Sequence, residues 1–218
     1  MGFVFSIAGL LAVLVLVGIG AMVRAGRYHE GAGDVDTRTF AEYGAPSRTL
    51  FTSQKVFSLH SRMTVTDASG QTVYETETKF PSLHDRTDIF RADGSLAAHF
   101  DAKFLTLHER HFVTMADGLS FEMSNELFHL VRDVTNIEGL GWRLEGNILA
   151  LNFTIRDADG EILAVIGNKV LSIHNKASID IYRPEYTDIL VTIVIVLQHM
   201  LRSRQAASSA SVSTSSNG

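Results

Sequence analysis

The chain of 218 residues contains no cysteine and only three prolines. The absence of cysteine excludes disulfide bonds, thiolate metal ligands and a cysteine nucleophile. Positive charge is not in excess either, because 19 Lys and Arg stand against 24 Asp and Glu, a formal net charge of −5. A nucleic-acid-binding surface normally needs a concentration of positive charge. We therefore expect no nucleic-acid partner.

Recognised catalytic motifs are also missing. The sequence has no Gly-rich phosphate loop, no Gly-x-Ser-x-Gly and no His-Glu-x-x-His. Charged residues alternate at Glu75, Glu77 and Lys79, and again at Asp101 and Lys103. Paired carboxylates can act as acid and base, but the solvated face of a strand explains this pattern better. We predict no enzyme activity, no catalytic residue and no cofactor.

One long hydrophobic run is present, since residues 3–23 are apolar apart from Ser6. As a helix, this run would measure roughly 30 Å at about 1.5 Å per residue, enough to span a bilayer. It lacks the basic start and the cleavage site of a signal peptide, so we predict an uncleaved anchor. Arg24 and Arg27 follow directly, which places the rest of the chain in the cytoplasm by the positive-inside rule. The expected partner of this segment is the membrane, in a single pass.

A short motif recurs every 24 residues, at 55–62, 79–86 and 103–110. Each copy begins with Lys, carries His five positions later and ends on Arg. A glycine follows each initial lysine after 15 residues, at Gly70, Gly94 and Gly118. A period of this length indicates one repeated supersecondary unit, and two short strands with two tight turns fit it.

Alternation of apolar and polar residues indicates antiparallel strands with one dry and one wet face. On one face of residues 96–104 we place Leu96, Ala98, Phe100, Ala102 and Phe104, and on the other Ala97, His99, Asp101 and Lys103. Residues 119–124 alternate in the same way. Gly160 closes a further Asp-Gly type turn, and such turns need a residue with positive φ.

A second apolar run covers residues 189–201, interrupted by Thr192, Gln198 and His199. Its length suits a buried core helix better than a membrane span. Thr187 or Asp188 would cap the start of that helix. A final strand and a second membrane segment stay open as alternatives, because Val and Ile also favour strands.

The repeated hairpins, the Asp-x-x-Gly turns, the pattern of residues 157–166 and the terminal apolar run together resemble the LURP-one-related family. That family is similar in fold to the tubby C-terminal domain and the phospholipid scramblases. The resemblance covers roughly residues 48–201. It implies a mainly β fold, a closed antiparallel barrel of about twelve strands around a central hydrophobic C-terminal helix. Tubby relatives bind phosphoinositide headgroups through basic residues, and none of those positions can be matched here.

Two sets of side chains invite a metal hypothesis. The repeated histidines are His60, His84, His108 and His174. Zinc needs three or four ligand atoms within about 2.0–2.2 Å of one point, whereas equivalent positions on a barrel rim are spread apart. Asp157 and Asp159 flank a turn but lack the spacing and the distal glutamate of an EF-hand. We predict that these residues cap or pack in their own turns, and we expect no metal site.

The chain is therefore divided into a transmembrane anchor (1–25), a linker (26–47), a barrel domain (48–204) and a disordered Ser- and Ala-rich tail (205–218). We expect a membrane-anchored, non-catalytic binding or scaffold module with the barrel on the cytoplasmic side. The alternatives are recognition of anionic phospholipid headgroups or scramblase-like lipid handling, and an enzyme of unrecognised type. The ligand-binding residues and any protein partner are not predicted.

Overall fold

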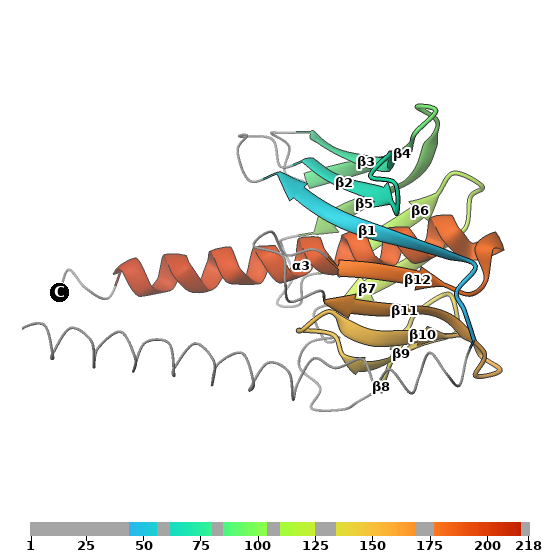
Figure 1. The fold of residues 1–218 in the computed structure, drawn as a ribbon. Coiled ribbons are helices and arrows are strands. Elements are labelled where there is room, and N and C mark those ends of the chain that lie inside the picture. Colours follow the sequence, from blue (N-terminus) through green and yellow to red (C-terminus); the bar gives the residue numbers. More distant parts are fainter. Residues whose placement is uncertain are drawn as a thin grey trace, which may run out of the picture.

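The computed structural model describes residues 44–55, 62–79, 85–103, 110–124, 134–168 and 177–214. These residues form twelve strands, one short 3-10 helix (η2, Pro184–Tyr186) and one long helix, α3 (Thr187–Thr214) (Figure 1). The strands are β1 (Arg48–Lys55), β2 (Arg62–Asp67), β3 (Thr72–Lys79), β4 (Asp85–Arg91), β5 (Leu96–Lys103), β6 (Arg110–Met115), β7 (Ser120–Ser124), β8 (Val134–Ile137), β9 (Trp142–Asn147), β10 (Asn152–Arg156), β11 (Ile162–Asn168) and β12 (Ala177–Ile181).

All twelve strands belong to one antiparallel sheet in the order β7-β6-β5-β4-β3-β2-β1-β12-β11-β10-β9-β8. The sheet curls until its two edge strands meet. There, an isolated bridge joins Glu122 and Glu138, with Glu122 N donating to Glu138 O over 3.1 Å. Gly139 permits this approach, because a Cβ at its position would lie 3.1 Å from Ser120 O. The predicted mainly β barrel is thus confirmed, and its closure is nearly complete rather than a full ladder.

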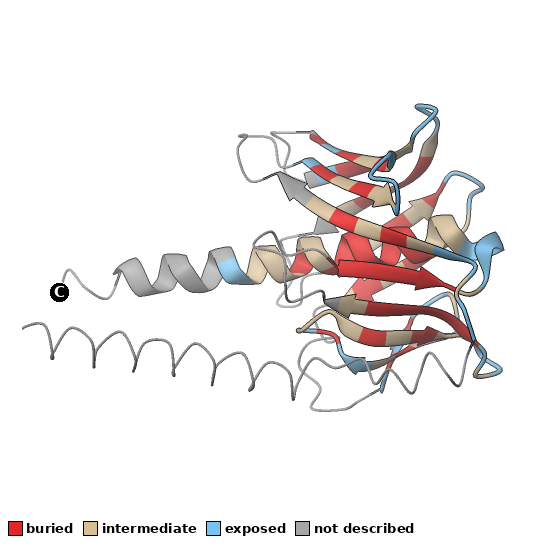
Figure 2. Cartoon of the chain, in the orientation of Figure 1, coloured by how far each residue is buried: buried red, intermediate tan, exposed pale blue. Residues whose placement is uncertain are grey.

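Helix α3 runs through the middle of the barrel (Figure 1). Every residue from Leu190 to Leu197 is buried, and so is Met200 (Figure 2). A segment that the sheet surrounds on all sides must form its backbone hydrogen bonds within itself. A helix forms these bonds, whereas a strand without a neighbouring strand does not. The structure therefore confirms the buried core helix over the final strand.

The first turn of α3 is fixed to the sheet through the carboxylate of Asp188. Tyr74 on β3 donates its hydroxyl to Asp188 Oδ1 over 2.6 Å, and Arg91 at the end of β4 donates to Oδ2 through Nε and Nη2. A carboxylate at a helix amino terminus also interacts favourably with the helix dipole. Asp188 thus lies at the predicted start of the helix. Its carboxylate also accepts hydrogen bonds from side chains of the sheet.

The helix continues to Thr214, although the sequence predicted a disordered tail from residue 205. Alanine is the strongest helix former, and residues 206, 207 and 210 are alanines. Adding residues to an existing helix avoids the unfavourable nucleation step. The core helix therefore provides the nucleus for this extension.

Strand β7 shows the predicted alternation, with Phe121 and Met123 buried between less buried neighbours. Strand β5 departs from it, because Ala97 and Ala98 are both buried while Leu96 is only half-buried. A register shift between Ile89 and Phe90 on the neighbouring strand β4 breaks the strict pairing here. An irregularity of this kind re-aims side chains locally, and a period-two pattern cannot reveal it.

The hairpin glycines adopt the predicted positive φ. The values are +84° at Gly70, +81° at Gly94, +92° at Gly118 and +88° at Gly160. In the turn after β2, Gly70 N donates to Asp67 O and Asp67 N donates to Gln71 O, the pattern of a three-residue loop with a bulge.

Within the described ranges, no helix is long and apolar enough to cross a bilayer. The predicted anchor at residues 3–23, Arg24 and Arg27 lie outside those ranges, as does most of the predicted linker.

Candidate functional site

The barrel has two different ends (Figure 1). The turn end carries the glycine turns after β2, β4, β6 and β10. The start of α3 lies at the same end, where Tyr74 near the start of β3 is bonded to it. At the exit end, strands β1, β3 and β5 finish and strands β2, β4 and β6 begin. Helix α3 leaves the barrel on this side.

One basic residue stands at the exit end, or one position inside it, of each of six neighbouring strands, since Asp85 precedes Arg86 at the start of β4. In the order β1 to β6 they are Lys55, Arg62, Lys79, Arg86, Lys103 and Arg110, and we call this set the basic arc. The six strands follow one another in the sheet, about 4.8 Å apart. The arc is therefore an unbroken row of positive positions along half of the barrel rim.

The register explains how the sequence repeat builds this row. Lys55 pairs with Arg62, and the equivalent lysine and arginine pair with each other at β3–β4 and at β5–β6. The first and last residues of each repeated motif are therefore direct cross-strand neighbours. Like charges in such positions repel and destabilise a sheet. The pairing therefore concentrates basic positions at the exit end of the barrel.

Carboxylates further inside the sheet hold the arginines of the arc. Arg62 Nη1 lies 3.2 Å from Glu75 Oε1, the Arg86 Nε lies 2.9 Å from an oxygen of Asp88, and Arg110 Nη1 donates to Glu122 over 2.8 Å. The three arginine side chains still expose 59%, 44% and 46% of their surface. Their guanidinium groups are thus positioned by the sheet while remaining accessible.

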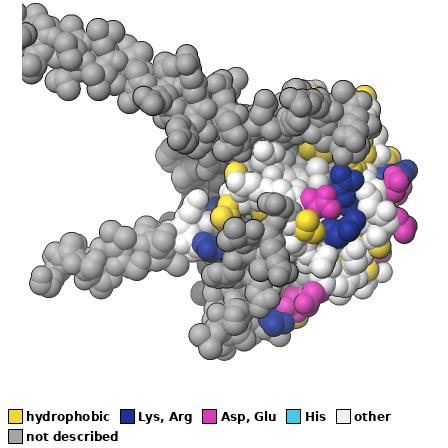
Figure 3. Space-filling view, turned by 90° about the horizontal axis from the view of Figure 1, so that it is seen from below, with side chains coloured by type: hydrophobic (Ala, Val, Ile, Leu, Met, Phe, Trp, Pro, Cys, Tyr) yellow, Lys and Arg dark blue, Asp and Glu magenta, His cyan; other side chains and the backbone are white. Residues whose placement is uncertain are grey.

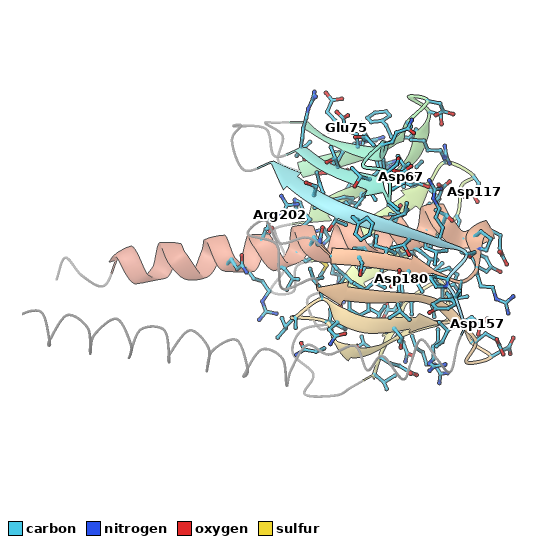
Figure 4. The ribbon with its side chains drawn as sticks, in the orientation of Figure 1. Asp67, Glu75, Asp117, Asp157, Asp180 and Arg202 are labelled. Carbon is cyan, nitrogen blue, oxygen red and sulfur yellow. The ribbon has the colours of Figure 1, made fainter. Side chains whose placement is uncertain are left out.

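Acidic residues occupy the opposite end of the barrel. Asp67, Asp117 and Asp157 lie there, whereas Arg202 lies toward the exit end (Figure 4). A hydrogen bond from the Ser69 side chain lowers the pKa of Asp67, and one from Ser95 lowers the pKa of Asp93 in the next turn. Asp67 and Asp93 are therefore ionised at neutral pH. The turns at this end of the barrel thus carry ionised carboxylates, at the end opposite the basic arc.

The structure does not assemble a catalytic site from the carboxylates noted in the sequence. Glu75 pairs with Arg62, and Glu77 on the same strand faces Asp88 across the ladder. Asp157 serves its turn, because its Oδ1 accepts the backbone N–H of Asp159 and of Glu161. The four repeated histidines, His60, His84, His108 and His174, lie outside the described residues. In the ranges that the structure describes, no group of three metal-ligating side chains comes together.

Two other histidines, which the sequence did not single out, lie inside the barrel. His111 on β6 and His199 on α3 have ring centroids 5.6 Å apart, and both rings contact Phe100. Burial lowers the pKa of His111 to about 3 and that of His199 to about 4. Both rings are neutral at physiological pH and pack as core aromatics. His111 shares the buried face of Val113 and Met115, and this alternation was the signal that could have found it.

The basic arc was not predicted from the sequence either, because the histidine of each motif was considered as a metal ligand and the flanking cations were not considered as a set. The lysine and arginine that bracket the motif, seven positions apart, carried the available signal. A hairpin pairs residues on either side of its loop, so two cations at the ends of one repeated loop predict one basic pair per hairpin.

A solved structure of a protein from Arabidopsis thaliana is similar at 15% sequence identity, covers 73% of this chain and 94% of that chain, and has a TM-score of 0.47. No curated protein matches the chain. The family model described as LURP-one-related matches residues 48–198, which span β1 to the buried part of α3. The chain therefore belongs to the LURP-one-related family.

Proposed function

We propose that this chain is a non-catalytic binding protein, held at a membrane by residues 3–23, that contacts anionic phospholipid headgroups with its basic arc. The observation that carries the proposal is the alignment of one cation at the end of each strand from β1 to β6. Phosphate and carboxylate groups on a lipid surface are the natural partners of such a row.

The filled interior supports a binding role over catalysis. Helix α3 occupies the centre of the barrel, and residues such as Val194 and Leu197 have no exposed surface. A substrate could enter this space only by displacing the core. The same filling argues against passage of a lipid through the barrel, so the proposal concerns recognition of headgroups and not their movement.

Weak individual contacts are sufficient for this role. Each basic residue close to an anionic surface contributes about 1 kcal/mol, and the carboxylates beside Arg62, Arg86 and Arg110 reduce their share. A membrane anchor would supply a high effective concentration, which converts weak contacts into appreciable occupancy. The arc then decides how the tethered barrel lies on the surface rather than whether it reaches the surface.

Vesicle sedimentation tests the proposal with residues 44–218, which contain every described strand, the whole of α3 and the hydrophobic core. A cooperative melting transition first establishes that the fragment is folded. We expect it to sediment with phosphatidylcholine vesicles that contain phosphatidylserine and not with phosphatidylcholine alone. Binding should fall as salt is raised, because screening weakens surface charge interactions. Equal sedimentation with both vesicle types, or none with either, would instead favour a scaffold for a protein partner.

A further inference from the structure

A pocket of about 480 Å³ lies at the turn end, on the side of the barrel away from the basic arc. It is enclosed by the β10–β11 turn, the residues after β12 and the chain just before β1, with Arg156, Glu161, Tyr182 and Arg183 among its lining. Its volume falls in the range of small-molecule sites, about 300–1,000 Å³.

Arg156 is held rigidly at the wall of this pocket. Its Nε donates to Glu145 Oε2 over 2.8 Å, and its Nη1 donates to Gly160 O over 2.8 Å. One bond to strand β9 and one to the β10–β11 turn fix the plane of the guanidinium. A group that is already ordered loses little entropy when a ligand binds.

Arg183 approaches the same pocket but is held weakly. Its Nη2 lies 3.5 Å from Glu161 Oε2, and the two side chains expose 48% and 66% of their surface. An exposed pair at this distance contributes little. Glu161 therefore lies beside Arg183 where the carboxylate of a bound ligand could lie. A ligand carboxylate could displace the Glu161 side chain from this position.

A third guanidinium adds positive charge behind the turn. Arg143 Nη2 lies 3.3 Å from the point where a Cβ would stand on Gly160, and Arg143 Nε lies 4.0 Å from Glu145 Oε1. Glu145 is thus shared between two arginines. Seen from the β8–β10 side, basic and acidic side chains gather toward this end of the molecule (Figure 3).

We propose that this pocket binds a small oxyanion, a carboxylate or phosphate group, between Arg156 and Arg183. The guanidinium fork of Arg183 can meet either group with two parallel hydrogen bonds, while Arg156, already bonded through Nε and Nη1, adds positive charge beside it. The ligand would displace Glu161 from Arg183 and meet the preorganised Arg156. The site lies at the end opposite the basic arc, so it does not depend on the headgroup proposal.

Titration of the full chain in detergent tests this site, with citrate and inorganic phosphate as probes and sodium chloride holding the ionic strength constant. We expect either probe to raise the melting temperature in a saturable way, and calorimetry to show a single site. Arg183→Ala should weaken binding about tenfold or more, because a charged hydrogen bond is lost. Glu161→Gln should strengthen it up to about fivefold, because the internal competitor is removed.

The matched control is Arg62→Ala, which removes another exposed arginine, at the other end of the barrel. It should leave the oxyanion affinity unchanged. No saturable stabilisation, or equal affinity in wild type, Arg183→Ala and Glu161→Gln, would overturn the site. Binding of glycerol 3-phosphate and of anionic vesicles shows whether the bound phosphate belongs to a soluble molecule or to a lipid headgroup. A vesicle affinity that Arg183→Ala leaves unchanged assigns the pocket to a soluble anion, and one that it lowers assigns it to a lipid phosphate.

Discussion

Val194 is the residue on which the central position of α3 can be tested most simply. It lies within the buried part of the helix and has no exposed surface. Val194→Asp would place a carboxylate where no solvent reaches it, at a cost of several kcal/mol. We expect the variant to lose its cooperative thermal unfolding transition. Circular dichroism during heating measures this loss.

The matched control is Leu149→Asp, since Leu149 is a large apolar residue with 56% of its surface exposed. This variant should melt close to wild type. If Val194→Asp melts at the same temperature as the control, the helix is not the core of the barrel.

Gly94 tests whether the turn after β4 requires a residue with positive φ. Its φ is +81°, and no atom lies within 4 Å of the position that a Cβ would take. Gly94→Val should therefore lower the free energy of unfolding by roughly 1–2 kcal/mol through backbone strain alone. Urea denaturation measures the loss. Gly94→Asn should lose less, because asparagine tolerates the left-handed region, and equal losses for the two variants would argue against strain as the cause.

The buried histidines predict how stability depends on pH. Burial lowers the pKa of His199 to about 4, whereas in an unfolded chain it is about 6.5. Between these values the unfolded state binds more protons, so the folded state loses stability as pH falls from about 6.5 to about 4, by up to about 1.4 kcal/mol per pH unit. His199→Leu should flatten this dependence in denaturation curves at pH 7.5, 5.5 and 4.5.

His199→Leu should cost little at pH 7.5. Within the described part of the chain, His199 Nδ1 has no hydrogen-bond partner, and replacing an unsatisfied polar group by an apolar one of similar size is close to neutral. An unchanged slope between pH 6.5 and 4 would show that other groups control the acid sensitivity.

At the scale of elements, the first turn of α3 is bonded to the sheet through the carboxylate of Asp188. Burial is the main cause that raises the pKa of Tyr74, and its hydrogen bond to Asp188 adds to it. Asp188→Asn would remove the charge that Tyr74 and Arg91 share. We expect a loss of roughly 1–2 kcal/mol in urea denaturation, since partial exposure weakens the ion pair. Glu185→Gln, an exposed carboxylate in the preceding turn, should change stability little, and equal effects would mean that only net charge matters.

The elements were largely predictable because local rules decide them. Positive φ at the turn glycines, the alternation of β7 and the apolar run of α3 each follow from residues close in sequence. The register shift beside Ile89 depends on two strands at once, and the helical continuation past Gln205 depends on the nucleus that the barrel protects. These features involve tertiary context, which a single-sequence pattern does not contain.

At the scale of the whole molecule, the closing seam and the two charged ends are the features that the sequence concealed. The seam depends on Gly139 fitting against β7, and the basic arc depends on register. A count of charges gives −5 for the chain and does not reveal the row of basic positions at the exit end. The positions were in the repeated motif, but only the pairing of strands brings them into one row.

Vesicle binding by two charge-matched variants of residues 44–218 tests the central claim most directly. One variant carries Lys55→Gln and Lys103→Gln in the basic arc, and the other carries Arg48→Gln and Gln71→Glu, two exposed positions at the turn end away from the oxyanion pocket. At about 1 kcal/mol for each lost cation, the first should bind phosphatidylserine vesicles roughly tenfold or more weakly than wild type, while the second binds almost as wild type does. Equal weakening of both variants would show that net charge alone drives binding, and no weakening of the first would contradict the role of the arc.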